Sequence, residues 1–136
     1  MENAENFRYV KRQHHLFQRY FHNDSRLLFM SRYPQQQHSD LIHWLKSIPN
    51  RYVLFGDLDL AGIAIYQNEY YRHLGERSSF LIPEDYEERI ANGTRSRYND
   101  QISKYRRMKI EDPRIGNLLS CIHQYHRGYD QEGYIE

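Results

Sequence analysis

The chain has few of several features that would place it in particular protein classes. Only one of its 136 residues, Cys121, is a cysteine, which excludes an intramolecular disulfide. No apolar run approaches the roughly 18 residues that a membrane-spanning helix needs. The first twenty residues are polar and aromatic and lack the apolar core of a secretory signal. We therefore expect a cytoplasmic protein with one modest core and no membrane partner.

The chain also has almost no excess of charge of either sign, because its formal net charge is only +1. Net charge therefore argues neither for nor against a nucleic-acid partner. Lysine is scarce, with four lysines against fifteen arginines. Arginine pairs bidentately with both phosphate and carboxylate groups. This bias fits a phosphate-bearing partner, and it equally fits a surface of arginine–carboxylate pairs.

The rest of the sequence is organised around residues 52–66. This segment opens with Tyr-Val-Leu-Phe, which predicts a buried strand, and ends in apolar residues at helical spacing. The intervening Gly-Asp-Leu-Asp predicts a tight turn at the carboxyl end of the strand, where ligands bind in open α/β sheets. Asp57 and Asp59 are two residues apart, so in an extended segment their carboxylates point the same way. Two such oxygen ligands suit Mg²⁺. Alternatively, Asp59 is only the N-cap of the next helix and Asp57 a turn former.

Residues 56–62, Gly-Asp-Leu-Asp-Leu-Ala-Gly, resemble the Asp-x-Asp motif of Toprim domains, in particular those of the type IIB topoisomerase A subunit and of the C-terminal domain of JetD from Wadjet anti-plasmid systems. The tail, residues 129–133, resembles a Gln-Glu element of the JetD group. The likeness covers residues 26–132. It implies an α/β, Toprim-like (Rossmann-like) fold, with a mainly parallel sheet of about four strands flanked by helices. This domain would span residues 25–136, after an amphipathic helix within residues 1–24.

The resemblance also implies an activity. Asp57 and Asp59 would bind Mg²⁺ or Mn²⁺ and act in phosphodiester cleavage, as in a JetD-like nuclease of plasmid or phage defence. Glu132 is the candidate for a third catalytic carboxylate if the tail folds back. The first strand should end in a glutamate, but Ser31 and Arg32 stand there instead. An arginine beside the aspartates either takes the metal's place or contacts phosphate. The alternative function is a catalytically degenerate module that binds DNA or a protein partner, or self-associates, without cleavage.

Hydrophobic spacing places the remaining elements. Strands are predicted over residues 26–30 and 78–82, with the first parallel to the central strand. Helices are predicted over residues 7–21, 38–48 and 61–74, the last one ending at Gly75. Further helices begin within residues 84–88 and 111–113, and Gly128 is expected to end the final one. Cys121 lies among apolar neighbours and is expected to pack as a small hydrophobe.

Residues 89–109 form the most basic stretch of the chain. Cations for the phosphate backbone, interleaved with tyrosines for stacking, are typical of nucleic-acid surfaces. The alternative is a solvated segment whose charges balance the acidic run before it. The DNA-contacting candidates are Arg95, Arg97, Lys104, Arg106 and Arg107. Farther along, His123 and His126 lie near Cys121, but no second Cys/His pair completes a zinc site.

Overall fold

The computed structural model describes residues 8–9, 11, 14–21, 26–30 and 38–134. Its centre is a parallel pair of strands, β1 (Tyr52–Leu54) and β2 (Ser78–Phe80), so the fold is mixed α/β. The register sets Tyr52 beside Ser78 and Leu54 beside Phe80. Parallel neighbours need a long crossover connection, and the helical segment predicted between these two strands supplies it here.

The crossover is one continuous helical run from residue 60 to residue 74, which confirms the predicted helix. It comprises α4 (Leu60–Ile65), the π-helical η2 (Tyr66–Tyr71) and α5 (Arg72–Leu74). The wider π turn buries the consecutive residues Tyr66 and Gln67. Gly75 ends the run with a φ of 62°, which a residue without a Cβ adopts readily, and η3 (Gly75–Arg77) leads into β2.

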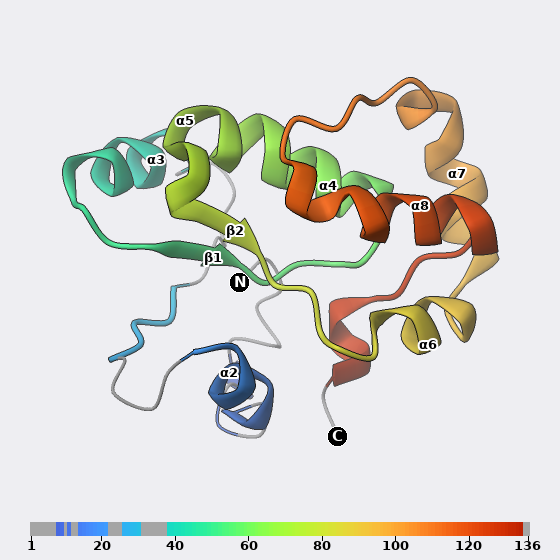
Figure 1. Ribbon diagram of the computed structural model, residues 1–136, viewed down its shortest axis with the longest axis horizontal. Helices are drawn as coiled ribbons and strands as arrows, with labels where there is room; N and C mark the ends of the chain where they lie inside the picture. Colours follow the sequence, from blue (N-terminus) through green and yellow to red (C-terminus); the bar gives the residue numbers. More distant parts are fainter. Residues whose placement is uncertain (1–7, 10, 12–13, 22–25, 31–37, 135–136) are drawn as a thin grey trace.

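Figure 1 shows the strands between α4, α5 and α8 on one side and α2 on the other. The packing of α2 on the core is carried by Phe17, whose ring lies 5.5 Å from that of Phe55. Cys121 is buried in the core, as predicted. The helices not yet given are α2 (His14–Tyr20), α3 (His38–Ser47), α6 (Tyr86–Ala91), α7 (Arg95–Tyr105), η4 (Pro113–Ile115), α8 (Gly116–Tyr125) and η5 (Gln131–Tyr134).

The prediction of a strand over residues 26–30 is wrong, since these residues belong to no strand. Phe29 packs against Phe17 with ring centroids 5.1 Å apart, whereas Leu28 is 76% exposed. The segment therefore has a strand-like apolar composition, but no strand in the described part of the chain pairs with its backbone. Within the described residues the sheet has two strands, not about four. Ser31 and Arg32 lie outside the described residues.

Two helix ends also differ from their predictions. Within the predicted helix of residues 7–21, the structure has α2 over His14–Tyr20, and parts of the predicted range lie outside the described residues. The last helix ends before His126, which adopts a left-handed conformation with φ 51° and ψ 44°, so Gly128 is not its stop. In the part of the chain that the structure describes, no helix is both long and apolar enough to cross a bilayer.

Candidate functional site

Asp59 caps the helix that follows β1. Its Oδ1 accepts a hydrogen bond of 2.6 Å from the Gly62 N–H, which confirms the N-cap interpretation. Its Oδ2 accepts a second bond of 2.9 Å from Gln101 Nε2 in α7. The residue is 2% exposed, and both carboxylate oxygens have donors. Asp59 therefore fixes the start of α4 against α7.

Gly62 explains why the motif carries a glycine inside a helix. A Cβ at this position would lie 2.1 Å from the carbonyl oxygen of Asp57, a distance that no side chain tolerates. The first turn of α4 therefore sits directly against the backbone of the acidic turn. This contact holds Asp57 and Asp59 in a fixed relation to each other.

Asp57 is held by the C-terminal tail. Its Oδ1 accepts a hydrogen bond of 2.7 Å from the backbone N–H of Gln131. The tail reaches this position because Tyr129 forms an antiparallel bridge with Leu58, with backbone hydrogen bonds of 2.9 and 3.0 Å. Residues far apart in sequence, at the carboxyl end of β1 and near the C-terminus, therefore form one structure.

Arg97 lies among three carboxylates. Its Nη1 is 3.1 Å from Asp57 Oδ2 and 3.3 Å from Asp59 Oδ2, and its Nη2 is 2.7 Å from Asp130 Oδ1. The sequence suggested Arg32 as an arginine that takes the place of the metal ion. Arg97 in α7 makes that contact. We call Asp57, Asp59, Asp130 and Arg97 the acidic cluster.

The acidic cluster has more negative than positive charge, because three carboxylates share one guanidinium. Burial raises the pKa of Asp57 to about 6, against the opposing effect of the Gln131 N–H, and the neighbouring Asp59 adds to the rise. Burial also raises the pKa of Asp130, with Arg97 opposing the shift and Glu132 adding to it. Perturbed carboxylates grouped at a strand's carboxyl end are typical of functional sites.

The tail folds back, as the sequence hypothesis required, but Asp130 is the tail residue that joins Arg97. Glu132 is exposed on η5, and its charge reaches the cluster through its effect on the pKa of Asp130. Asp130 belongs to residues 129–133, the tail segment that the resemblance singled out, but only Glu132 was predicted from it to act at the site. No motif indicated Gln101, and Gln131 was given no role although it belongs to the Gln-Glu element of residues 129–133.

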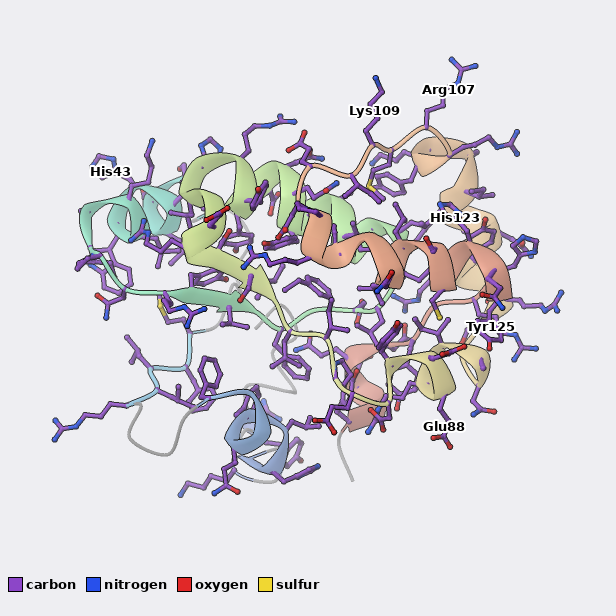
Figure 2. The ribbon with its side chains drawn as sticks, in the orientation of Figure 1. His43, Glu88, Arg107, Lys109, His123 and Tyr125 are labelled. Atoms are coloured by element: carbon purple, nitrogen blue, oxygen red, sulfur yellow. The ribbon has the colours of Figure 1, made fainter. Side chains whose placement is uncertain are left out.

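The other predicted DNA-contacting residues are more exposed to solvent than Arg97. Arg95, Lys104, Arg106 and Arg107 are exposed along α7 and just past its end. Figure 2 shows Arg107 and the nearby Lys109 pointing into solvent. Arg97 differs because it is partly buried and its guanidinium is engaged by carboxylates. In this conformation it faces the protein's own acids.

The donor chemistry of the acidic cluster fits a hard divalent cation, because carboxylate oxygens are what Mg²⁺ and Mn²⁺ prefer. In the structure, the Arg97 guanidinium lies between these carboxylates. Among the described residues, no three His, Cys, Asp or Glu side chains are grouped as metal ligands. A metal ion at this site therefore requires Arg97 to move away from the carboxylates.

Comparison with known proteins leaves the site to be interpreted from its own chemistry: no protein-family model, no curated protein and no solved structure matches the chain.

Proposed function

We propose that the chain is a Toprim-like, divalent-metal-dependent domain that acts on DNA, with phosphodiester cleavage as its reaction. The observation that supports the proposal is the acidic cluster, in which Asp57 and Asp59 after β1 and Asp130 of the tail each contact the same cation, Arg97. The cluster has surplus negative charge and the pKa of Asp57 is raised, as expected of a site that can bind a further cation.

In this proposal Asp57, Asp59 and Asp130 hold Mg²⁺ or Mn²⁺. When bound, the metal ion supplies charge stabilisation to a phosphodiester undergoing cleavage. Arg97, once it leaves the carboxylates, has its guanidinium donors available for a phosphate oxygen, which it binds bidentately. Gln101 and the Gln131 N–H keep Asp59 and Asp57 in position through this exchange.

The second candidate is a Toprim-like module that binds DNA or a protein partner without cutting. A specific observation favours it: Asp59 already has donors on both oxygens, and Arg97 fills the space between the carboxylates. In this case Arg97 is a permanent substitute for the metal ion, and the acidic cluster only ties α4, α7 and the tail together.

Calorimetric titration with Mn²⁺ separates the two candidates. We expect the parent to bind the ion and Asp57→Asn to lose binding, because the substitution removes a charged ligand. Asp40→Asn is the matched control, since Asp40 is exposed on α3. Supercoiled plasmid DNA incubated with Mg²⁺ then reports cleavage. Absence of Mn²⁺ binding in the parent overturns the metal-dependent proposal, and metal binding without cleavage favours the second candidate.

Arg97→Met tests the competition between the guanidinium and the metal ion. If Arg97 must leave before the cation enters, the variant binds Mn²⁺ about tenfold more tightly, or about 1.4 kcal/mol. It also loses DNA cleavage, because the phosphate contact is gone. An unchanged Mn²⁺ affinity in Arg97→Met contradicts the exchange of one cation for the other.

A further inference from the structure

A shallow hollow of about 570 Å³ lies between α7 and α8, apart from the acidic cluster. Of the described residues that line it, none is acidic and three carry cationic or titratable nitrogen groups. They are Tyr98, Asn99, Ile102, Arg106, His123 and His126. The side chains of Tyr98, Ile102 and Arg106 follow one another at four-residue spacing along α7. Such spacing places them on one face of the helix.

His126 occupies a backbone position that favours glycine. Among the described residues it is the only one other than glycine with a positive φ, 51°, and it follows the last residue of α8. Glycine commonly takes this place at helix ends because a Cβ is disfavoured there. The His126 ring is stacked on Tyr98, with centroids 5.0 Å apart and planes 24° apart. Such a disfavoured conformation, kept by a residue with an exposed ring, points to function.

His123 adds a directed polar group to the same hollow. Its Nδ1 is 2.9 Å from the Tyr98 hydroxyl, so the ring orientation is fixed by α7. Burial lowers the pKa of His123, and His126 adds to the effect, so the ring is neutral at pH 7. In the tautomer in which the Tyr98 hydroxyl donates to Nδ1, the ring proton is on Nε2 and makes this nitrogen a donor. Figure 2 places His123 where α8 faces α7.

Arg106 supplies the positive charge. It is exposed at the C-terminal end of α7, and the described residues lining the hollow offer it no carboxylate. The hollow therefore combines a cation, an imidazole ring held in place by Tyr98 and an exposed aromatic ring already stacked on a second ring. A phosphate next to an unpaired base matches all three features, because unstacked bases pack on aromatic rings and phosphates pair with arginine.

We propose that this hollow binds one nucleotide of a single-stranded nucleic acid, with the base stacked on His126 and the phosphate held by Arg106 and His123. A base within a duplex has no free face for such stacking, which is why the single strand is favoured. The inference shares with the proposed function only the class of its ligand. Arg97 and Gln101 of α7 contact the carboxylates of the acidic cluster, and Tyr98 and Ile102, one position along, line the hollow.

The test is fluorescence anisotropy of a labelled twelve-residue oligothymidylate without divalent metal. His126→Gly removes the ring and supplies the residue that the left-handed conformation favours. We expect its thermal midpoint to equal or exceed that of the parent while affinity falls about tenfold, the loss of one base–aromatic stack. Unchanged affinity in this folded variant overturns the proposal.

Arg106→Gln should weaken binding and lower the slope of log affinity against log salt by about 1. Lys46→Gln is the matched control, because it removes one positive charge from the exposed face of α3 and should leave affinity close to that of the parent. Equal losses in both variants contradict a specific phosphate contact at Arg106 and indicate general charge attraction.

Two competitors identify the ligand. A twelve-base-pair duplex that displaces the oligothymidylate as well as an unlabelled single strand overturns the choice of single-stranded nucleic acid. Inorganic phosphate that displaces the oligothymidylate as well as the unlabelled single strand does identifies a free-phosphate site instead. The anisotropy assay contains no divalent metal and reports only the hollow, whereas the Mn²⁺ titration reports only the acidic cluster, so failure at the hollow and failure of metal binding are separate results.

Discussion

Two regions of this protein join a buried aspartate to an arginine, and they differ in how their charges balance. In the acidic cluster three carboxylates share Arg97. In the other region Asp112 alone is paired with Arg114 at 2.8 Å, and the Tyr66 hydroxyl donates a 2.6 Å hydrogen bond to it. Arg114 also donates to the Ser78 carbonyl at the start of β2. This second region joins η4 to the sheet.

The direction of the pKa shifts separates the two regions. Burial would raise the pKa of Asp112, but hydrogen bonds from Arg114 and Tyr66 hold it below its ordinary value. In the acidic cluster burial is not compensated, and the pKa of Asp57 rises to about 6. A satisfied pair such as Asp112 with Arg114 serves stability, whereas an uncompensated cluster at a strand end costs stability and is retained for another reason.

The two regions should differ most in how their stability responds to a glycine-to-alanine substitution in the backbone. Gly62→Ala forces a Cβ onto the Asp57 carbonyl, so we expect a loss of about 3 kcal/mol in the free energy of unfolding. Gly116→Ala, beside the Asp112 region, meets only Ile110 Cδ1 at 3.6 Å and should gain about 0.5 kcal/mol from helix propensity. Urea denaturation measures both. Similar effects of the two substitutions contradict the close packing of α4 on the acidic turn.

A smaller effect is expected from Arg114→Met, which leaves the Asp112 carboxylate buried without its cation. We expect a loss of about 2 kcal/mol, below the usual cost for a fully buried pair because the Arg114 side chain is 44% exposed. Arg72→Met breaks an exposed pair with Glu111 and should change stability by about 0.3 kcal/mol. If Arg72→Met proves as costly as Arg114→Met, the Asp112 region has no special role in stability.

The smallest expected effect is a difference in pH dependence. The pKa of Asp57 in the folded protein, about 6, lies above the ordinary 3.8, so the protonated form favours folding. Its contribution is complete below pH 3.8 and is lost as the pH rises through 6. We expect the parent to lose about 1.5 kcal/mol relative to Asp57→Asn between pH 4 and pH 7, about half of what the full shift implies, because the side chain is 28% exposed.

For Asp112 we expect the opposite dependence of the free energy of unfolding on pH. Its pKa in the folded protein is lowered, so its contribution is present above pH 3.8 and is lost as the pH falls through the lower folded value. Urea denaturation from pH 3 to pH 8 of the parent, Asp57→Asn and Asp112→Asn therefore separates the two regions by the sign of their pH dependence. Slopes of the same sign for both aspartates contradict the comparison.

Local patterns in the sequence were sufficient for much of the framework. Apolar spacing predicted the helices over residues 38–48 and 61–74, and the stop at Gly75, because these depend on contacts three and four residues apart. Local reasoning also offered the N-cap as the alternative to a metal ligand for Asp59, since a cap involves only its own helix. It failed at residues 26–30, because an apolar segment becomes a strand only when another strand pairs with its backbone.

The sequence by itself therefore determined the acidic turn, the helix that follows it and the presence of aspartates at a strand's carboxyl end. Only the tertiary structure decided that Arg97 lies between them and that Asp130 joins them. The contacts of Arg97 with Asp57 and Asp59 span 40 and 38 residues, and the hydrogen bond from the Gln131 N–H beside Asp130 to Asp57 spans 74. No local periodicity encodes such distances. They arise when α7 and the tail pack against the end of β1, where burial brings three carboxylates onto one arginine.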